Sequence, residues 1–314
     1  MSVQTVREAL APQAGAVEVA PLSIHIGAEI HGVDLSHPLP PEHVSAVRSA
    51  LLRWKVVFFR DQSLDHGRHI AAARQFGETT AGHVVYGSDG EYPQIYSVAK
   101  NRKANRFQGQ VLFRPWSGWH TDITAAINPP AASILRGDIV PPYGGDTQFT
   151  NLVAAYNALS PVMRTFVDGL RGVHRFAPPP GVDETPEYRE LMRKRTLESE
   201  HPIVRVHPES GERALFVSPS FLKSIVGLSA RESQVLLEFL WEHVVRPEFT
   251  VRFRWAPGSV AFWDNRATAH LAPRDIFDSD FDRQFYRVTL VGDVPIGVNG
   301  KPSSALQGEP IVAV

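Results

Sequence analysis

Two segments far apart in the sequence carry potential metal ligands, and any fold of this chain must bring them together. One segment, Gly118–Asp122, contains His120 and Asp122, and the other runs from Trp263 to His270. On a strand, the side chains of His120 and Asp122 leave the same face. Two neutral imidazoles and one carboxylate leave three adjacent positions open on a six-coordinate ion, as a mononuclear non-haem Fe(II) site requires. The three residues suggest redox chemistry.

The spacing of these ligands is not specific when it is taken alone. The chain contains 13 histidines, so a His-x-Asp triplet arises easily by chance. Surface histidines and hydrogen-bonded core histidines are the ordinary alternative. A metal site at His120, Asp122 and His270 therefore needs support from the rest of the sequence.

A strand pattern after His270 provides a second signal. Residues 281–291 alternate so that Arg283 and Arg287 share one face with Phe285, Thr289 and Val291. Inside a barrel, each guanidinium needs an anion to offset its desolvation. The two Cα atoms are about 13 Å apart at ~3.3 Å per residue, so two separate anions are the simpler interpretation. The alternative is a solvated sheet face with acidic partners.

Composition narrows the class of protein. The charge is balanced, with 32 basic and 33 acidic residues, so no overall electrostatic footprint for nucleic acid or an anionic membrane exists. Cysteine is absent, which leaves nitrogen and oxygen as iron ligands and excludes disulfides. Residues 1–20 lack a signal-peptide pattern, and no apolar run approaches ~20 residues. We expect a cytoplasmic homo-oligomer with a small-molecule partner, binding neither nucleic acid nor membrane.

Hydrophobic patterns predict the surrounding elements. Residues 41–54 read as an amphipathic helix leading into a buried strand at 56–59, and residues 249–255 alternate as a half-buried antiparallel strand does. Ser229 and Glu232 predict a capping box that opens a helix through Val245. The apolar stripe expected for that helix consists of Val235, Leu236, Phe239 and Leu240. With 314 residues, 43% of them hydrophobic, we expect one domain over 1–314, with its core at about 21–293 and a tail at 294–314.

An ordered set of motifs resembles the taurine dioxygenase (TauD/TfdA) family of Fe(II)/2-oxoglutarate-dependent dioxygenases. The set spans about Pro21 to Asp293 and is far more specific than any single motif. Its members are Ile26–Leu35, Val56–Gln62, Trp119–Asp122, Gly144–Thr147, His201–Pro208, Ala214–Val217, Phe262–Arg266, His270 and Arg283–Asp293. The resemblance implies a mainly β fold with flanking helices, built on a double-stranded β-helix, the jelly-roll or cupin-like core.

The resemblance also implies roles for individual residues. His120, Asp122 and His270 would be the catalytic residues that bind Fe(II), and Arg283, assisted by Thr147, would bind the distal carboxylate of 2-oxoglutarate. Arg287 matches the position that grips the substrate's sulfonate in the taurine enzyme. The reaction would consume O2 and decarboxylate 2-oxoglutarate to succinate and CO2. Because Asp122 stands where related halogenases have a small residue, hydroxylation, desaturation or epoxidation is favoured over halogenation.

Other substrate-binding positions depart from the family pattern. Residues Gly82–Tyr86 resemble the taurine enzyme's substrate-contacting segment, with His83 and Tyr86 as contacts, but they need a one-residue shift from Phe76–Gly77; an ordinary surface loop is the alternative. Trp116 replaces an asparagine that binds taurine, and an indole favours a larger, more apolar substrate. Two charged or proline-containing stretches, 100–116 and 176–199, could cover the site or lie on the surface, and the second could also meet another subunit.

The predicted substrate is an anionic, partly apolar small molecule. A natural-product intermediate is our preferred hypothesis, for example in pentalenolactone-type sesquiterpenoid oxidation. The alternatives in the same family are catabolism of a sulfonate, an alkyl sulfate or an aryloxy acid. More remote are a Zn(II) hydrolase using the same three ligands and a non-catalytic barrel that binds a small acid.

Overall fold

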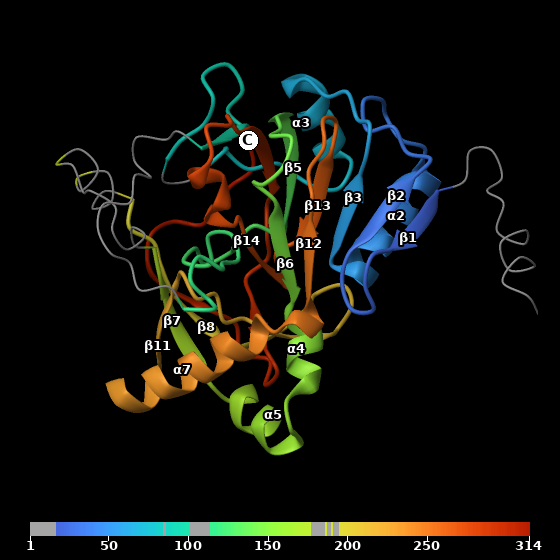
Figure 1. Ribbon diagram of the computed structural model, residues 1–314. Helices are drawn as coiled ribbons and strands as arrows, with labels where there is room; N and C mark the ends of the chain where they lie inside the picture. Colours follow the sequence, from blue (N-terminus) through green and yellow to red (C-terminus); the bar gives the residue numbers. More distant parts are fainter. Residues whose placement is uncertain (1–16, 84–85, 101–113, 177–185, 187–189, 191–194) are drawn as a thin grey trace, which may run out of the picture.

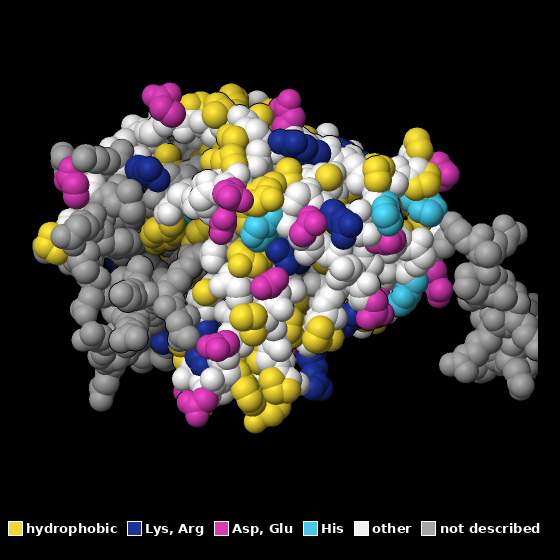
Figure 2. Space-filling view, turned by 90° about the horizontal axis from the view of Figure 1, so that it is seen from above, with side chains coloured by type: hydrophobic (Ala, Val, Ile, Leu, Met, Phe, Trp, Pro, Cys, Tyr) yellow, Lys and Arg dark blue, Asp and Glu magenta, His cyan; other side chains and the backbone are white. Residues whose placement is uncertain are grey.

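The computed structural model describes residues 17–83, 86–100, 114–176, 186, 190 and 195–314. Strands occupy the centre of the molecule, and helices lie at its rim (Figure 1). On the face seen in Figure 2, basic and acidic side chains are intermingled, in keeping with the balanced charge of the sequence.

The largest sheet has seven strands in the order β1-β2-β3-β13-β5-β15-β4. Its β2 and β3 pair in parallel, and the other neighbours are antiparallel. At the centre, β5 is paired on both sides, so that Ser133 lies opposite Trp263 on one neighbour and Thr289 on the other. The strands are β1 (Glu18–Pro21), β2 (Ala28–His31), β3 (Val56–Phe59), β13 (Val260–Asp264), β5 (Ala132–Ile139), β15 (Gln284–Leu290) and β4 (Tyr96–Ala99).

The described residues form three smaller sheets as well. One has the order β12-β6-β14, made from β12 (Thr250–Phe253), β6 (Thr147–Asn151) and β14 (Thr268–Leu271). Another has the order β11-β7-β8-β17, made from β11 (Leu222–Ile225), β7 (Arg171–Arg175), β8 (Glu198–Pro202) and β17 (Ser304–Gln307). The last has the order β10-β9-β16, made from β10 (Arg213–Leu215), β9 (Val204–Val206) and β16 (Ile296–Gly297).

Aromatic side chains hold the large sheet against the sheet that contains β6. Phe58 of β3 stacks on Phe253 of β12 with ring centroids 3.9 Å apart, and Trp263 of β13 packs on Phe149 of β6 at 5.4 Å. All four side chains are at most 2% exposed. Sheets packed through interdigitating inner faces form the core of a jelly roll. The predicted mainly β, double-stranded β-helix fold is confirmed.

Helices cover the sheets as the hydrophobic patterns predict. Helix α2 (Pro41–Trp54) buries Val47 and Leu51 and leads directly into β3, as expected for residues 41–59. The other helices among the described residues are α3 (His66–Arg74), α4 (Leu152–Ala158), α5 (Pro161–Asp168) and α7 (Ala230–Val244), with short 3-10 helices η2 (Pro247–Phe249) and η3 (Arg274–Asp278). No helix in the described part of the chain is long and apolar enough to cross a membrane.

The predicted apolar stripe of α7 is partly wrong. The capping box between Ser229 and Glu232 is present, but Val235 and Phe239 are 50% and 45% exposed. The helix instead buries Leu237, Leu240, Trp241 and Val244, which are spaced by three or four residues. The sequence offered two overlapping apolar faces, and packing against α4 and β11 selected the second.

The segment after Asp293, for which the sequence suggested no role, is integrated into the fold. Besides β16 and β17, it contributes Ile311, which is 7% exposed. The side chain of Asn128 makes two hydrogen bonds to the backbone of Ile311. Its Nδ2 donates to the Ile311 carbonyl at 2.9 Å, and its Oδ1 accepts from the Ile311 N–H at 2.8 Å. The tail is therefore attached beside the segment that follows Asp122.

Candidate metal centre and its surroundings

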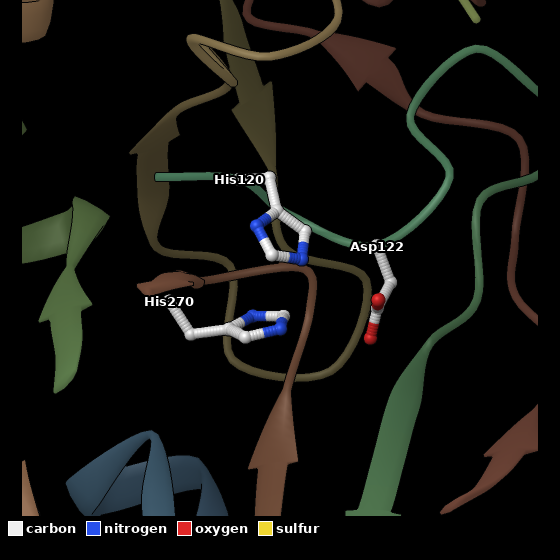
Figure 3. Close-up of side chains that lie close together, drawn as sticks. All are labelled: His120, Asp122 and His270. Atoms are coloured by element: carbon white, nitrogen blue, oxygen red, sulfur yellow. The ribbon is translucent and has the colours of Figure 1, made fainter. Parts of the chain in front are cut away.

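The fold brings His120, Asp122 and His270 together (Figure 3). One ligand atom from each residue lies within 4.8 Å of the others. The two histidines form a single β-bridge, in which each backbone N–H donates to the other residue's carbonyl, at 2.9 Å and 2.7 Å. Backbone pairing between His120 and His270 thus brings His270, which is distant in the sequence, next to His120 and Asp122.

The segment carrying His120 and Asp122 is not the regular strand that the spacing assumed. His120 forms only the bridge to His270, and a turn begins at Asp122. Thr121 fixes this irregular backbone, because its Oγ1 donates to the carbonyl of Thr268 at 2.7 Å. Gly118 has φ +85°, and a Cβ there would come within 2.9 Å of the side chain of Leu271. A glycine is needed at this close approach.

Burial sets the protonation of the three side chains. It lowers the pKa of His120 and lowers that of His270 well below its usual value, so both imidazoles are neutral near pH 7. Burial raises the pKa of Asp122, but the Arg287 guanidinium, the two imidazoles and the Ser133 hydroxyl outweigh it, and the net pKa is lowered. The centre therefore offers two neutral nitrogen ligands and one carboxylate.

This donor set fits a divalent metal ion. His120 Nδ1 lies 3.0 Å from the carbonyl of Gly118, which leaves Nε2 as the lone-pair donor when Nδ1 carries the proton. His270 Nδ1 is buried and has no hydrogen-bond partner within the described residues. The His270 ring is held between Trp263 and Phe149, at 4.8 Å and 6.0 Å between centroids. Oriented imidazoles with an unpaired buried nitrogen are typical of a metal site.

Arg283 lies just before β15 in a position suited to an anion. It is 7% exposed, its Nε donates to the carbonyl of Gly145 at 3.1 Å, and its guanidinium lies 3.8 Å from the centroid of Phe285. Neither Nη has a hydrogen-bond partner within the described residues. Burial lowers the pKa of Arg283 to about 10, which leaves it cationic at neutral pH. A buried cation with free donors is an anion-binding group.

Thr147 is reached from Arg283 through two aromatic side chains. Phe285 packs on Trp255 with centroids 4.6 Å apart, and Trp255 Nε1 donates to Thr147 Oγ1 at 3.0 Å. Thr147 is 3% exposed and follows Gly145, the acceptor for Arg283, by two residues. The predicted 2-oxoglutarate residues therefore belong to one neighbourhood.

Arg287 lies on β15 and makes a different set of contacts. Its Nη1 donates to Asp122 Oδ1 in a short hydrogen bond, and its guanidinium lies 5.1 Å from the ring centroid of Tyr96. Arg287 is 7% exposed, and its Nε has no hydrogen-bond partner within the described residues. The second predicted anion-binding arginine is thus in direct contact with the metal centre.

His83 and Tyr86 lie beside Arg287 through Tyr96. The His83 ring is 4.8 Å from that of Tyr96 and 4.6 Å from that of Tyr86. Both His83 and Tyr86 also contact Phe176. The predicted substrate-contacting pair is thus brought next to the second arginine.

An apolar cluster extends from these rings to the candidate metal ligand His120. We define it as Tyr86 with the buried residues Ile123, Ala125, Ala126, Phe176, Leu197, Phe221 and Ile311. Phe221 lies 5.6 Å from Phe176 and 6.5 Å from the ring of His120. Because Ile123 follows Asp122 directly, the apolar cluster adjoins the candidate metal centre. Ile311, which Asn128 binds, belongs to the same cluster.

Trp116 lies apart from this cluster. Its ring packs 6.1 Å from that of Trp241 on α7, against a different part of the core. The contact of Trp116 with substrate remains a prediction. The candidate covering loops 100–116 and 176–199 fall mostly outside the described residues, which exclude 101–113, 177–185, 187–189 and 191–194.

Several residues at this site were not predicted from the sequence. Ser133 donates to Asp122 Oδ2 at 2.7 Å, and Asn265 donates to Ser133 at 2.9 Å. Asn265 stands inside one of the family motifs, but Ser133 is a small polar residue in a strand outside all of them. Phe221 and Ile311 carried no signal at all, because one apolar residue resembles any other until the fold is known.

Comparison with known proteins agrees with this geometry. The family model described as "Taurine catabolism dioxygenase TauD, TfdA family" matches residues 18–289. An alpha-ketoglutarate-dependent sulfate ester dioxygenase of Pseudomonas putida is 41% identical over 304 residues, covering 94% of this chain and 96% of the relative. An alkylsulfatase of Acinetobacter baylyi is 37% identical over 295 residues, covering 90% and 88%.

A solved structure extends the likeness to three dimensions. A putative alpha-ketoglutarate-dependent taurine dioxygenase from Burkholderia xenovorans aligns with a TM-score of 0.84 at 62% identity, covering 94% of this chain and 100% of that one. The predicted family and enzyme class are confirmed. With its jelly roll, its His-Asp-His centre and these relatives, the chain belongs to the TauD/TfdA family of dioxygenases.

Proposed function

We propose that this enzyme uses Fe(II), 2-oxoglutarate and O2 to oxidise an anionic small molecule with an apolar body. The observation that supports this most strongly is the pairing of one metal centre with two buried arginines. Asp122 and two neutral histidines lie within 4.8 Å, and Arg283 and Arg287 stand four residues apart on the adjoining strand segment. One cation serves the cosubstrate and the other serves the substrate.

The residues have separate tasks. His120, Asp122 and His270 hold the metal ion, which supplies oxidation by O2 coupled to decarboxylation of 2-oxoglutarate. Arg283 binds the distal carboxylate of 2-oxoglutarate with its free Nη donors, and Thr147 supports it through Trp255. Arg287 binds the anionic group of the substrate, which requires it to exchange its contact with Asp122 for one with the substrate.

We propose an alkyl sulfate or alkyl sulfonate as the substrate class. The relative with 41% identity is named for sulfate esters, and the one with 37% identity is named an alkylsulfatase. Arg287 suits the anionic group, and the apolar cluster beside His120 suits a hydrocarbon chain. Hydroxylation of the carbon that bears a sulfate would yield an aldehyde and inorganic sulfate, while 2-oxoglutarate becomes succinate and CO2.

A carboxylate-bearing terpenoid is the second candidate. Pentalenolactone F synthase of Streptomyces arenae is 29% identical over 297 residues and 90% of this chain. A carboxylate would bind Arg287 as well as a sulfate does, because a guanidinium fork matches both. In that case the product is a hydroxylated, desaturated or epoxidised acid.

The first test is an anaerobic visible absorption titration of metal-free protein with Fe(II) and then 2-oxoglutarate. A charge-transfer band that needs both additions, and that weakens in Arg283→Ala, is the expected result. Tight Zn(II) binding without any band would instead favour a hydrolase. A third outcome is a wild-type protein that turns over no substrate but binds a small acid, and that loses this binding in His120→Ala. That outcome would favour a non-catalytic barrel.

A substrate panel then separates the candidates. Hexyl sulfate, hexanesulfonate, taurine, an aryloxyacetate and a terpenoid acid are each supplied with Fe(II), 2-oxoglutarate and O2, and succinate is measured. Succinate formed in step with sulfate from hexyl sulfate is expected. Succinate formation with the terpenoid acid alone would overturn the alkyl sulfate proposal and favour the second candidate.

A further inference from the structure

Three buried side chains outside the predicted site form a hydrogen-bonded chain that ends on Asp122. Trp263 Nε1 donates to Asn265 Oδ1 at 2.9 Å, Asn265 Nδ2 donates to Ser133 Oγ at 2.9 Å, and Ser133 Oγ donates to Asp122 Oδ2 at 2.7 Å. All four residues are at most 2% exposed. We propose that Ser133, Asn265 and Trp263 are positioning residues that hold the carboxylate of Asp122 in the orientation needed by the metal ion.

The chemistry of the donors fixes the direction of every bond in this chain. An indole N–H can only donate, so the Asn265 oxygen must face Trp263 and its NH2 must face Ser133. The Ser133 oxygen accepts that bond, and its single proton goes to the acceptor-only carboxylate of Asp122. Asp122 Oδ2 therefore accepts a hydrogen bond that the fold holds in place, and Oδ1, which Arg287 contacts in this structure, is the oxygen that the metal would take.

The scaffold under this chain is rigid. Ser133 lies in the middle of the seven-stranded sheet and is paired with Trp263 on one side and Thr289 on the other. The backbone N–H of Asn265 donates to the carbonyl of Ala131 at 2.9 Å. A side chain whose backbone is fixed on both sides can hold its hydroxyl in one place.

The same chain also reaches a second ligand. The Trp263 ring packs 4.8 Å from the ring of His270, so the residue that begins the chain to Asp122 also contacts His270. Displacement of Trp263 or Asn265 would therefore change the positions of both Asp122 and His270. Supporting hydrogen bonds of this kind typically change metal affinity about 10- to 100-fold when they are removed.

Arg287 cannot take over this role. It contacts Asp122 Oδ1, but the proposed function requires it to turn to the substrate, and its Nε already lacks a partner. Ser133 contacts the other oxygen and takes no part in that exchange. We infer that Ser133 keeps Asp122 in place while Arg287 changes its partner.

The test compares Ser133→Ala with Ser233→Ala. Ser233 on α7 is a matched control, because it is also buried and uses its hydroxyl in one structural hydrogen bond, from the N–H of Ile225 at 2.9 Å. The inference rests on the proposed function only in assuming a divalent metal, so the first readout is Mn(II) affinity under anaerobic conditions. The second is the energy of the absorption band formed with Fe(II) and 2-oxoglutarate.

Ser133→Ala should bind Mn(II) at least tenfold more weakly and shift the band, whereas Ser233→Ala should leave both unchanged. Trp263→Phe removes only the indole N–H and should shift both readouts in the same direction by less, which keeps the test open if Ser133→Ala folds poorly. Wild-type Mn(II) affinity in both Ser133→Ala and Trp263→Phe would overturn the inference. Absence of a band in wild type would count against the proposed function instead, and Mn(II) affinity would still decide the role of Ser133.

Discussion

In the described part of the chain, two buried aspartate–arginine pairs differ in how completely their polar atoms are satisfied. Arg266 donates to both oxygens of Asp264, at 2.9 Å and 2.7 Å, and its remaining Nη1 donates to Glu209 at 2.7 Å. His207 completes Asp264 at 2.9 Å. In the other pair, Arg287 contacts one oxygen of Asp122, and within the described residues its Nε has no hydrogen-bond partner. The Nδ1 of His270 in the same centre also has none there.

The contrast separates a structural pair from a functional one. Burial of charge is tolerated where every donor and acceptor is used, and such a pair holds one geometry. Asp264 and Arg266 fix the turn that leads from β13 to His270, since the Asp264 carbonyl also accepts from Thr268 at 2.7 Å. Polar atoms left unpaired in the core indicate where a ligand completes the structure.

The largest effect is expected for Arg266→Ala. It removes the permanent cation from the buried Asp264 carboxylate, which keeps only His207 and one backbone N–H as partners, so the free energy of unfolding should fall by about 3–5 kcal/mol, measured by urea denaturation. Arg246→Ala is the control, because that arginine pairs with Glu248 on the surface, where the side chains are 50% and 56% exposed. A similar small loss in both variants would mean that the Asp264 pair is no more structural than a surface pair.

Arg287→Gln should destabilise metal-free protein by less, about 2 kcal/mol, because Ser133 still donates to Asp122. Saturating Mn(II) should then stabilise this variant more than it stabilises wild type, since no guanidinium competes for the carboxylate. In Arg266→Ala the gain from Mn(II) should equal that of wild type. Thermal unfolding with and without Mn(II) measures this stabilisation in wild type, Arg287→Gln and Arg266→Ala. Equal stabilisation of all three proteins would contradict the distinction between the pairs.

A milder change at the functional pair should affect substrate binding with little effect on folding. Arg287→Lys keeps the charge but loses the planar fork, so KM for hexyl sulfate should rise about tenfold, or about 1.4 kcal/mol. Steady-state kinetics at saturating 2-oxoglutarate provide the measurement. An unchanged KM would show that the substrate's anion does not bind at Arg287.

The smallest of the expected effects is a loss of folding stability in acid that arises from the Asp264–Arg266 pair. Burial raises the pKa of Asp264, but Arg266 and His207 outweigh it and hold the net pKa below the usual 3.8. The unfolded chain therefore takes up a proton first as pH falls, and stability is lost from about pH 4 downward at about 0.7 kcal/mol per pH unit initially. Urea denaturation from pH 6 to 3 should show a shallower loss in Asp264→Asn than in wild type.

Much of the site could be predicted from sequence, for identifiable reasons. The alternation of residues 281–291 predicted that Arg283 and Arg287 are buried together with Phe285, and all three are at most 7% exposed, although Arg283 lies just before β15. His120, Asp122 and His270 followed from a spacing that became specific only within the ordered motifs. Charged and ligating side chains are few in a core, so each one carries information about function.

The remaining features depended on three-dimensional packing. Nothing in the sequence distinguishes the buried face of α7 from the face carrying Val235 and Phe239, because both are apolar at helical spacing. Ser133 becomes meaningful only when Trp263 and Asn265 are seen beside it. The apolar cluster is likewise assembled from six separate segments, and no local pattern specifies which of their apolar residues meet.

The attachment of Ile311 also orders events during synthesis. Asn128 and Ile311 are 183 residues apart, and the two hydrogen bonds between them join the segment after Asp122 to the last wall of the apolar cluster. A growing chain is made from its N-terminus, so the three candidate metal ligands and both arginines leave the ribosome before Ile311 does. The contribution of Ile311 to the apolar cluster can therefore be made only after the residues of the candidate metal centre have been synthesised.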